Sequence, residues 1–251
     1  MKTDITQKTD ILKPILFRDF PGPEFRFLLD FSKRAVWIFQ NVNKGNEIVG
    51  AAVVKALQRR GFGAEYVPTR EDALRRILEI VPENASVGIP GTVTVREIGA
   101  LDALKARGNT IYQHWGQMTP QERRIARDRE NSADVFLTSA NAITRDGRII
   151  NIDGTGNRVA GMAWGGENNG LVLFVAGLNK LAFGLEDGLE RARSATIPNA
   201  IRQNEPTACT KAGHCVNCLD EYSMCRAILI LEQAVKGRNY HVILVGETLG
   251  Y

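Results

Sequence analysis

The chain has 251 residues, of which 44% are hydrophobic and 24% charged, as in globular proteins that bury their own core. This composition excludes disorder as a description of the whole chain, and the interleaved 32 basic and 28 acidic side chains show no basic stripe for nucleic acid. The longest strongly apolar run, Gly170–Leu178, is too short for a membrane span, and charged residues interrupt the N-terminus where a signal peptide needs an apolar core. The sequence therefore predicts a cytoplasmic protein without a membrane span or a nucleic-acid partner.

The first 44 residues differ from the rest of the sequence. Residues 1–22 are proline-containing and lack periodicity, which predicts an extended arm. From Pro23 onward, apolar side chains fall on two faces of a predicted helix. Packing within the same domain and a homodimer interface through residues 1–44 would each explain the two faces. We predict an N-terminal arm and helix over 1–44 and one α/β domain over 45–251.

After residue 45 helical and strand patterns alternate. In chain order, the patterns predict a helix at 45–60, a strand at 64–67, a helix at 69–80, a strand at 85–89, a helix with the capping box Thr94/Glu97, a strand at 109–115, a helix at 119–131, strands at 134–138, 148–152 and 171–176, a helix at 184–194, a helix at 223–235 and a strand at 241–245. Residues 171–176 are apolar throughout, as in a strand covered on both faces. The alternation predicts a three-layer α/β/α sandwich with a mostly parallel sheet.

All four cysteines lie close together in the sequence, at Cys209, Cys215, Cys218 and Cys225. Disulfide scaffolds are short and spread their cysteines through the chain, whereas nearby thiolates in a glycine-containing loop can converge on one metal centre. Four cysteines suit a [4Fe–4S] cluster, which we favour, or a zinc ion. Reduced thiols, or a disulfide formed on oxidation, remain the alternative without a metal. His214 could replace one cysteine as a ligand or be an ordinary loop residue.

Four polar loops follow predicted strands, where open α/β sheets bind ligands. They span 88–94, 138–144, 151–158 and 177–180. Exposed backbone N–H groups, short polar side chains and two cations in these loops predict a site for a carboxylate or phosphate anion. The candidate ligand-binding residues are Gly91, Thr92, Ser139, Asn141, Asp153, Gly154, Thr155, Gly156, Asn157, Arg158, Asn179 and Lys180.

The two cations among these candidates have ordinary alternatives. Arg158 could clamp an anion with its two-pronged guanidinium or hold its own loop in place, and Lys180 could neutralise an anion or be a solvated turn lysine. The loop at 151–158 is not a nucleotide-cofactor fingerprint, because Val159 stands at the position of the third glycine.

No catalytic constellation is legible in the sequence. The three histidines are scattered, and neither a nucleophile elbow nor a metal-binding helix motif is present. Glu97 and Asp153 are the carboxylates expected nearest the loops and are therefore the catalytic candidates. A helix cap would explain Glu97 equally well, and support of the glycine turn would explain Asp153.

The string from Ala133 to Gly147, continued through residues 151–158, resembles the lactate-utilisation (LUD) domain family. Residues 91–97, the four cysteines with Asn217 and Arg226, and the ending 245–251 match the same family. The resemblance covers about 45–251 and implies a fold like that of the sugar-phosphate isomerase and CoA-transferase superfamily. The catalytic carboxylate of the CoA-transferases has no counterpart motif here.

Members of this family include a small subunit of a bacterial iron–sulfur system that oxidises L-lactate to pyruvate. The resemblance therefore implies an iron–sulfur accessory or subunit in the oxidation of lactate or a related 2-hydroxy acid, with redox partner subunits. One alternative is a non-redox isomerase or acyl- or CoA-transferase-like enzyme that binds a phosphorylated or CoA ligand and carries structural zinc. Another is a regulatory module that binds a small anion without turnover.

Overall fold

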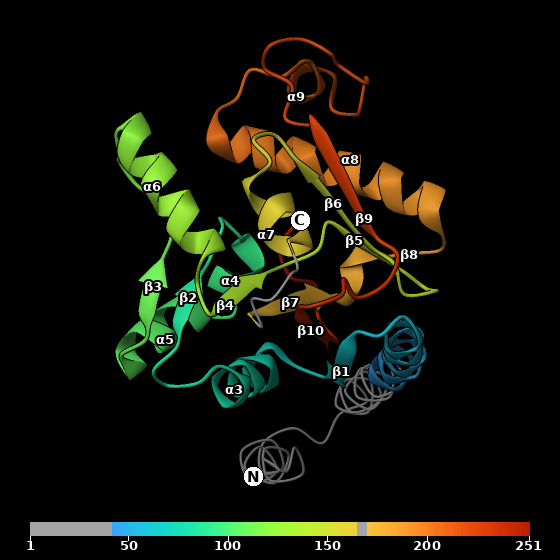
Figure 1. Ribbon diagram of the computed structural model, residues 1–251. Helices are drawn as coiled ribbons and strands as arrows, with labels where there is room; N and C mark the ends of the chain where they lie inside the picture. Colours follow the sequence, from blue (N-terminus) through green and yellow to red (C-terminus); the bar gives the residue numbers. More distant parts are fainter. Residues whose placement is uncertain (1–41, 165–169) are drawn as a thin grey trace, which may run out of the picture. The chain divides into compact units, whose positions relative to one another are not determined.

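The computed structural model describes residues 42–164 and 170–251 (Figure 1). The chain divides into two units, Met1–Gly45 and Asn46–Tyr251, and the description below concerns the second. The predictions for residues 1–44 lie outside the described residues, apart from 42–44, which are helical. Among the described residues, none of the helices combines the length and apolar character that crossing a bilayer requires.

The second unit is built on a six-stranded parallel sheet with the strand order β1-β10-β7-β4-β2-β3. Its strands are β1 (Gly63–Val67), β2 (Ser86–Gly88), β3 (Thr110–Tyr112), β4 (Val135–Thr138), β7 (Leu171–Gly177) and β10 (Asn239–Val245). β7 pairs with β10 on one side and β4 on the other and is buried from Val172 to Gly177. The prediction of an apolar central strand is confirmed.

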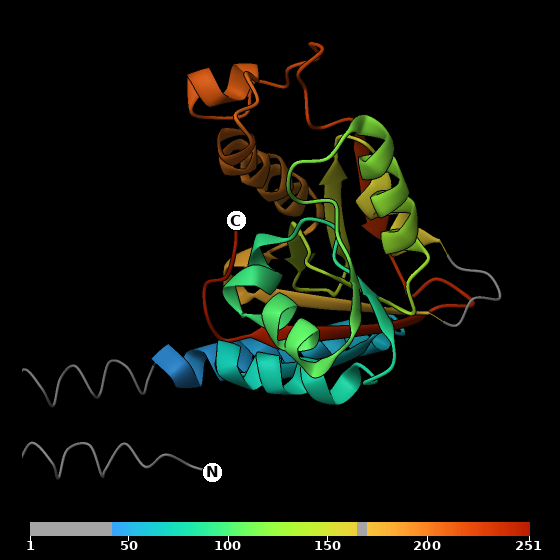
Figure 2. The ribbon, with the colours of Figure 1, turned by 90° about the vertical axis from the view of Figure 1, so that its left-hand side faces the viewer.

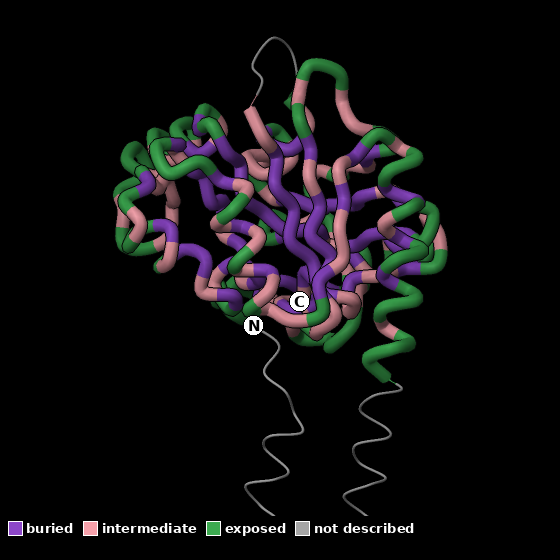
Figure 3. The backbone as a smooth tube through the Cα atoms, turned by 90° about the horizontal axis from the view of Figure 1, so that it is seen from below, coloured by how far each residue is buried: buried purple, intermediate pink, exposed green. Residues whose placement is uncertain are grey.

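Helices cover both faces of this sheet, as predicted, because successive strand residues point to opposite faces. On one face, Leu173 and Val175 pack against α3 (Arg70–Ile80), α4 (Val93–Glu97) and α5 (Ala100–Arg107). On the other face, Val172 and Phe174 pack against the helix that ends at residue 59 and against Met162 of α7 (Asn157–Ala163). The buried segments in Figure 3 run through these strands.

A second sheet, absent from the sequence prediction, adds to the layer over Val172 and Phe174. It has four strands in the order β8-β5-β6-β9 and consists of β5 (Ala142–Thr144), β6 (Ile149–Asp153), β8 (Leu181–Ala182) and β9 (Ala227–Leu231). Its outer surface packs against α8 (Leu185–Gln203) through residues such as Ile150 and Ala192. The predicted helix at 223–235 is therefore wrong. A short apolar run fits either element, and antiparallel pairing with β6 makes it a strand.

The predicted helix starts at 69 and 119 are confirmed. Thr69 caps α3, and Thr119 with Glu122 forms a capping box at the start of α6 (Pro120–Asn131). The capping box at Thr94 and Glu97 is wrong: α4 begins at Val93, and both side chains contact other parts of the chain. α8 extends well beyond the predicted end at 194, with Pro198 inside it, and is followed by the short helix α9 (Ala208–Ala212).

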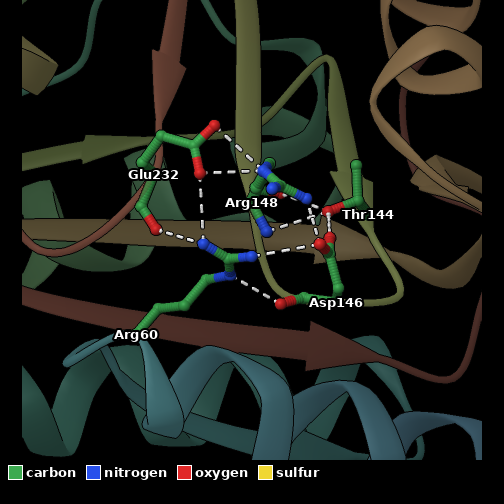
Figure 4. Close-up of polar contacts among 5 residues, drawn as sticks. All are labelled: Arg60, Thr144, Asp146, Arg148 and Glu232. Atoms are coloured by element: carbon green, nitrogen blue, oxygen red, sulfur yellow. Dashed lines mark hydrogen bonds and ion pairs between the residues drawn. The ribbon is translucent and has the colours of Figure 1, made fainter.

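Arg60 joins the helix that ends at residue 59 to the second sheet (Figure 4). Its Nε donates to the Asp146 carbonyl at 2.6 Å and its Nη1 to the Glu232 carbonyl at 2.7 Å. The Asp146 carboxylate lies 3.0 Å from Nη2. Arg148, which lies in the β5–β6 hairpin, forms ion pairs with the carboxylates of Asp146 and Glu232. Arg60 thus fixes a helix, a hairpin turn and the end of β9 with one half-buried guanidinium.

We expect Arg60→Ala to lower the free energy of unfolding by about 1–3 kcal/mol, because two backbone carbonyls and two carboxylates lose a charged donor. Arg59→Ala is the matched control, since Arg59 is exposed and its truncation should change stability by less than about 0.5 kcal/mol. Urea unfolding of the unsubstituted protein and of the two variants measures both changes in the free energy of unfolding. Equal stability of the two variants would contradict this role of Arg60.

Candidate functional site

A polar cleft lies at the carboxyl ends of the parallel strands. It encloses about 960 Å³, its open mouth included, between the loops after β2, β4 and β6 and the C-terminal half of α8. This is the edge where open α/β sheets place ligands. It is lined by main-chain turns and polar side chains, with few apolar groups.

Most of the sequence-predicted ligand-binding residues meet in this cleft. Those that line it are Gly91, Thr92, Ser139, Asn141, Asp153, Gly154, Thr155, Asn157, Arg158 and Lys180. Two others do not. Gly156 caps α7 with φ 84°, and Asn179 exchanges hydrogen bonds with the backbone of Leu249. Ligand binding by the lining residues stays a prediction.

Lys180 lies at the floor of the cleft and is only 4% exposed. A short 3-10 turn, Leu178–Lys180, carries it directly after β7. Its ammonium group donates to the hydroxyls of Thr94 and Ser139, each at 2.9 Å. No carboxylate of the described residues forms an ion pair with it. The solvated-lysine alternative is therefore wrong.

The environment of Lys180 disfavours its charged form. Burial lowers the pKa of its ammonium group to about 7, and the nearby charges of Arg191 and Arg158 act in the same direction, while Glu97 opposes them. At neutral pH the group is therefore close to half protonated. An anion in the cleft would favour the protonated form and would be held by it.

The loop after β6 is built around the Asp153 carboxylate. Its two oxygens accept from the backbone N–H groups of Thr155, Arg158 and Val159 at 3.0, 2.8 and 3.2 Å. Burial tends to raise the pKa of Asp153, but the Arg158 charge and these N–H groups outweigh it and hold that pKa below 3.8. Asp153 thus supports the glycine turn.

Arg158 belongs to the same loop structure. Its guanidinium donates to the Ile152 carbonyl and lies 3.9 Å from the Asp153 carboxylate. These contacts match the reading in which Arg158 holds its own loop, although the side chain also lines the cleft. Glu97, the other catalytic candidate, does not line it, and its carboxylate accepts from the Gly250 N–H at 2.7 Å.

Other lining residues were not among the sequence candidates. His114 and Trp115 follow β3, Arg127 comes from α6, and Thr196 and Arg202 come from α8. The strand-end rule could have found His114 and Trp115, because the predicted strand ended at 115. The α8 residues were missed because that helix was predicted to end at 194.

The segment with the four cysteines, residues 209–225, is called the cysteine segment and lies beyond α8 in both views (Figures 1 and 2). Cys209 is buried in α9, with its sulfur 3.0 Å from the Thr207 hydroxyl. Burial raises the pKa of Cys225, Thr196 and the charge of Arg193 lower it, and Cys215 and Cys218 act in the same direction as burial. Among the described residues, no three His, Cys, Asp or Glu side chains are arranged to hold a metal ion. The donor chemistry suits a thiolate-bound centre, but the geometry is not preassembled.

The cysteine segment also touches the cleft. Met224, next to Cys225 in the sequence, lines the cleft directly, and Thr196, which also lines the cleft, lowers the pKa of Cys225. The N–H of Arg226 donates to the Asp153 carbonyl at 3.0 Å. A change at these cysteines would therefore reach the wall of the cleft through direct contacts.

The fold and the cleft define an α/β protein with a polar pocket at the carboxyl edge of a parallel sheet. The sequence model of the LUD domain family matches residues 51–245, so the chain belongs to the LUD domain family. A search of curated proteins finds no match. Among solved structures, a DUF162 family protein from Deinococcus radiodurans is similar over 80% of this chain and 98% of that chain, with 12% sequence identity and a TM-score of 0.46.

We expect Asp153→Asn to destabilise the protein by about 1–3 kcal/mol at neutral pH, because an amide offers one acceptor oxygen and no charge to Arg158. Since folding lowers the pKa of Asp153 below 3.8, its charge stabilises the fold above that value and loses the effect as the pH falls through the folded-state pKa. The difference from the unsubstituted protein should therefore shrink as the solution is made more acidic than the usual pKa of an aspartate. Urea unfolding at neutral and at acidic pH, with exposed Asp128→Asn as control, measures this. A difference independent of pH would contradict it.

Proposed function

We propose that this LUD-domain protein binds a small carboxylate or phosphate anion at Lys180 and acts as an iron–sulfur-associated accessory or subunit in the oxidation of lactate or a related 2-hydroxy acid. The observation that supports the anion site is the Lys180 ammonium group, which is 4% exposed and has no carboxylate partner among the described residues. Burying such a cation is unfavourable unless a partner stabilises it.

The groups around Lys180 suit an oxyanion. An ammonium group has three N–H donors, and the described residues accept from two of them, through Thr94 and Ser139. Each of these hydroxyls keeps a proton of its own to donate. The Asn157 Nδ2, on the same cleft, is buried without a partner in the described structure. A bound carboxylate or phosphate would accept from several of these donors at once.

The redox part of the proposal is supported by family membership and by the contact of the cysteine segment with the cleft. A cluster held by Cys209, Cys215, Cys218 and Cys225 would supply electron transfer. Lys180, Thr94 and Ser139 would bind and orient the carboxylate or phosphate oxygens.

We expect Lys180→Met to weaken binding of L-lactate and of pyruvate at least tenfold, because a neutral side chain cannot meet their charge. The affinity of the unsubstituted protein should fall about tenfold per pH unit above its Lys180 pKa, as the ammonium group loses its proton, and level off below it. Isothermal titration calorimetry across this range measures both effects, with exposed Lys105→Met as control. Equal affinities for Lys180→Met and Lys105→Met would overturn the anion site.

The redox part is tested by metal analysis of anaerobically purified protein. We expect iron with broad visible absorption that bleaches on reduction, and loss of most of that iron in Cys218→Ser and Cys225→Ser, because a thiolate ligand is removed. Exposed Lys211→Ala, in the same segment, should keep the iron. Stoichiometric zinc in a colourless sample would instead favour the non-redox enzyme, and protein without metal would favour the regulatory module.

A further inference from the structure

A second pocket adjoins the Lys180 cleft. It encloses about 560 Å³, mouth included, and five residues line both the pocket and the cleft, so the two are continuous. The residues that line the second pocket are His114, Trp115, Gly116, Arg123, Arg127, Arg202 and Gln203. We call it the arginine pocket.

The arginine pocket has an uncompensated positive charge. None of the described residues that line it is acidic, and Arg123, Arg127 and Arg202 form no ion pair within the described part of the chain. Arg123 donates to the carbonyls of His114 and Gly116 at 3.1 and 3.5 Å, and Arg202 to the Asn199 amide oxygen at 2.7 Å. These partners are neutral and leave the charges unbalanced.

Arg127 carries an unused donor. Its Nε is buried and has no hydrogen-bond partner in the described structure. A buried donor without a partner is unfavourable, and the penalty is larger for a charged group. Glu130, on the same helix, is fully buried and holds the His114 ring, with its carboxylate 2.7 Å from Nδ1. Glu130 therefore already has a partner.

One further cation, Arg96, lies at the edge of the pocket and shares the Trp115 ring with Arg202. The guanidinium carbons of Arg96 and Arg202 lie 3.9 and 4.5 Å from the centre of the Trp115 ring. The pKa of Arg96 is lowered, first by burial and also by the charge of Arg202, although Asp102 opposes both. These like charges repel each other, and an anion bound near both would reduce the repulsion.

We propose that the arginine pocket binds a phosphate group, and that the natural ligand is an acid with two anionic groups, a phosphate at Arg127 and Arg202 and a carboxylate at Lys180. Guanidinium groups favour phosphate because their paired N–H donors match its oxygens. The carboxylate end of this proposal rests on the proposed function of Lys180, whereas the phosphate end rests on the arginine pocket alone.

The test measures binding of inorganic phosphate, pyruvate and 3-phosphoglycerate by isothermal titration calorimetry to full-length protein. Arg127→Gln and Arg202→Gln should each weaken phosphate and 3-phosphoglycerate at least tenfold and leave pyruvate within twofold. Lys180→Met should weaken binding of pyruvate and 3-phosphoglycerate and retain the phosphate binding that depends on Arg127 and Arg202. Exposed Arg124→Gln, on the same helix as Arg127, is the control.

A second readout follows the pocket itself. Phosphate should change the tryptophan fluorescence of the protein but not that of Trp115→Phe, because Trp115 lines the arginine pocket. Phosphate binding that depends on Lys180 and not on Arg127 or Arg202 would overturn the arginine pocket while leaving the anion site at Lys180 intact. Phosphate binding that depends on the arginines, with pyruvate binding unaffected by Lys180→Met, would overturn the anion site at Lys180 and leave the arginine pocket intact. Absence of phosphate binding would also overturn the arginine pocket.

Discussion

A buried ammonium group that forms no ion pair with an acid of the described residues is the constraint around which the cleft is organised. Lys180 can occupy this position because the central strand β7 ends directly before it and because two hydroxyls, from α4 and from the loop after β4, converge on it. Its lowered pKa is the electrostatic consequence of that burial. A methionine there would avoid the desolvation penalty, so the lysine is better explained by binding or chemistry than by stability.

α8 connects the three functional regions of the second unit. Its C-terminal half lines the Lys180 cleft through Thr196 and the arginine pocket through Arg202. The same Thr196 contacts Cys225, and Ala192 packs against the second sheet. α8 is therefore adjacent to the Lys180 cleft, to the arginine pocket and to Cys225.

The sequence predicted the parallel sheet well because its strands are continuous apolar runs between clear turn and cap signals, as at 171–176. It predicted one strand of the second sheet, at 148–152, but missed the other three, since β5 and β8 are very short and the residues of β9 fit a helix equally well before the partner strand is known. Strand-end reasoning brought most candidate residues to one cleft. It missed Arg127 and Arg202, because they lie on helices that approach the cleft only through tertiary packing.

The contacts of each cation separate structural roles from binding roles. Arg60 and Arg158 both bind carbonyls and carboxylates of their own chain, so their charges are already compensated and their removal should act first on stability. Lys180 and Arg127 lack such acidic partners among the described residues, and their charges remain available to a ligand. Arg158 looked like the anion clamp in the sequence because it follows a glycine turn. Its contacts show that it also holds that turn, so a ligand would meet further charges from Lys180 and from the arginine pocket.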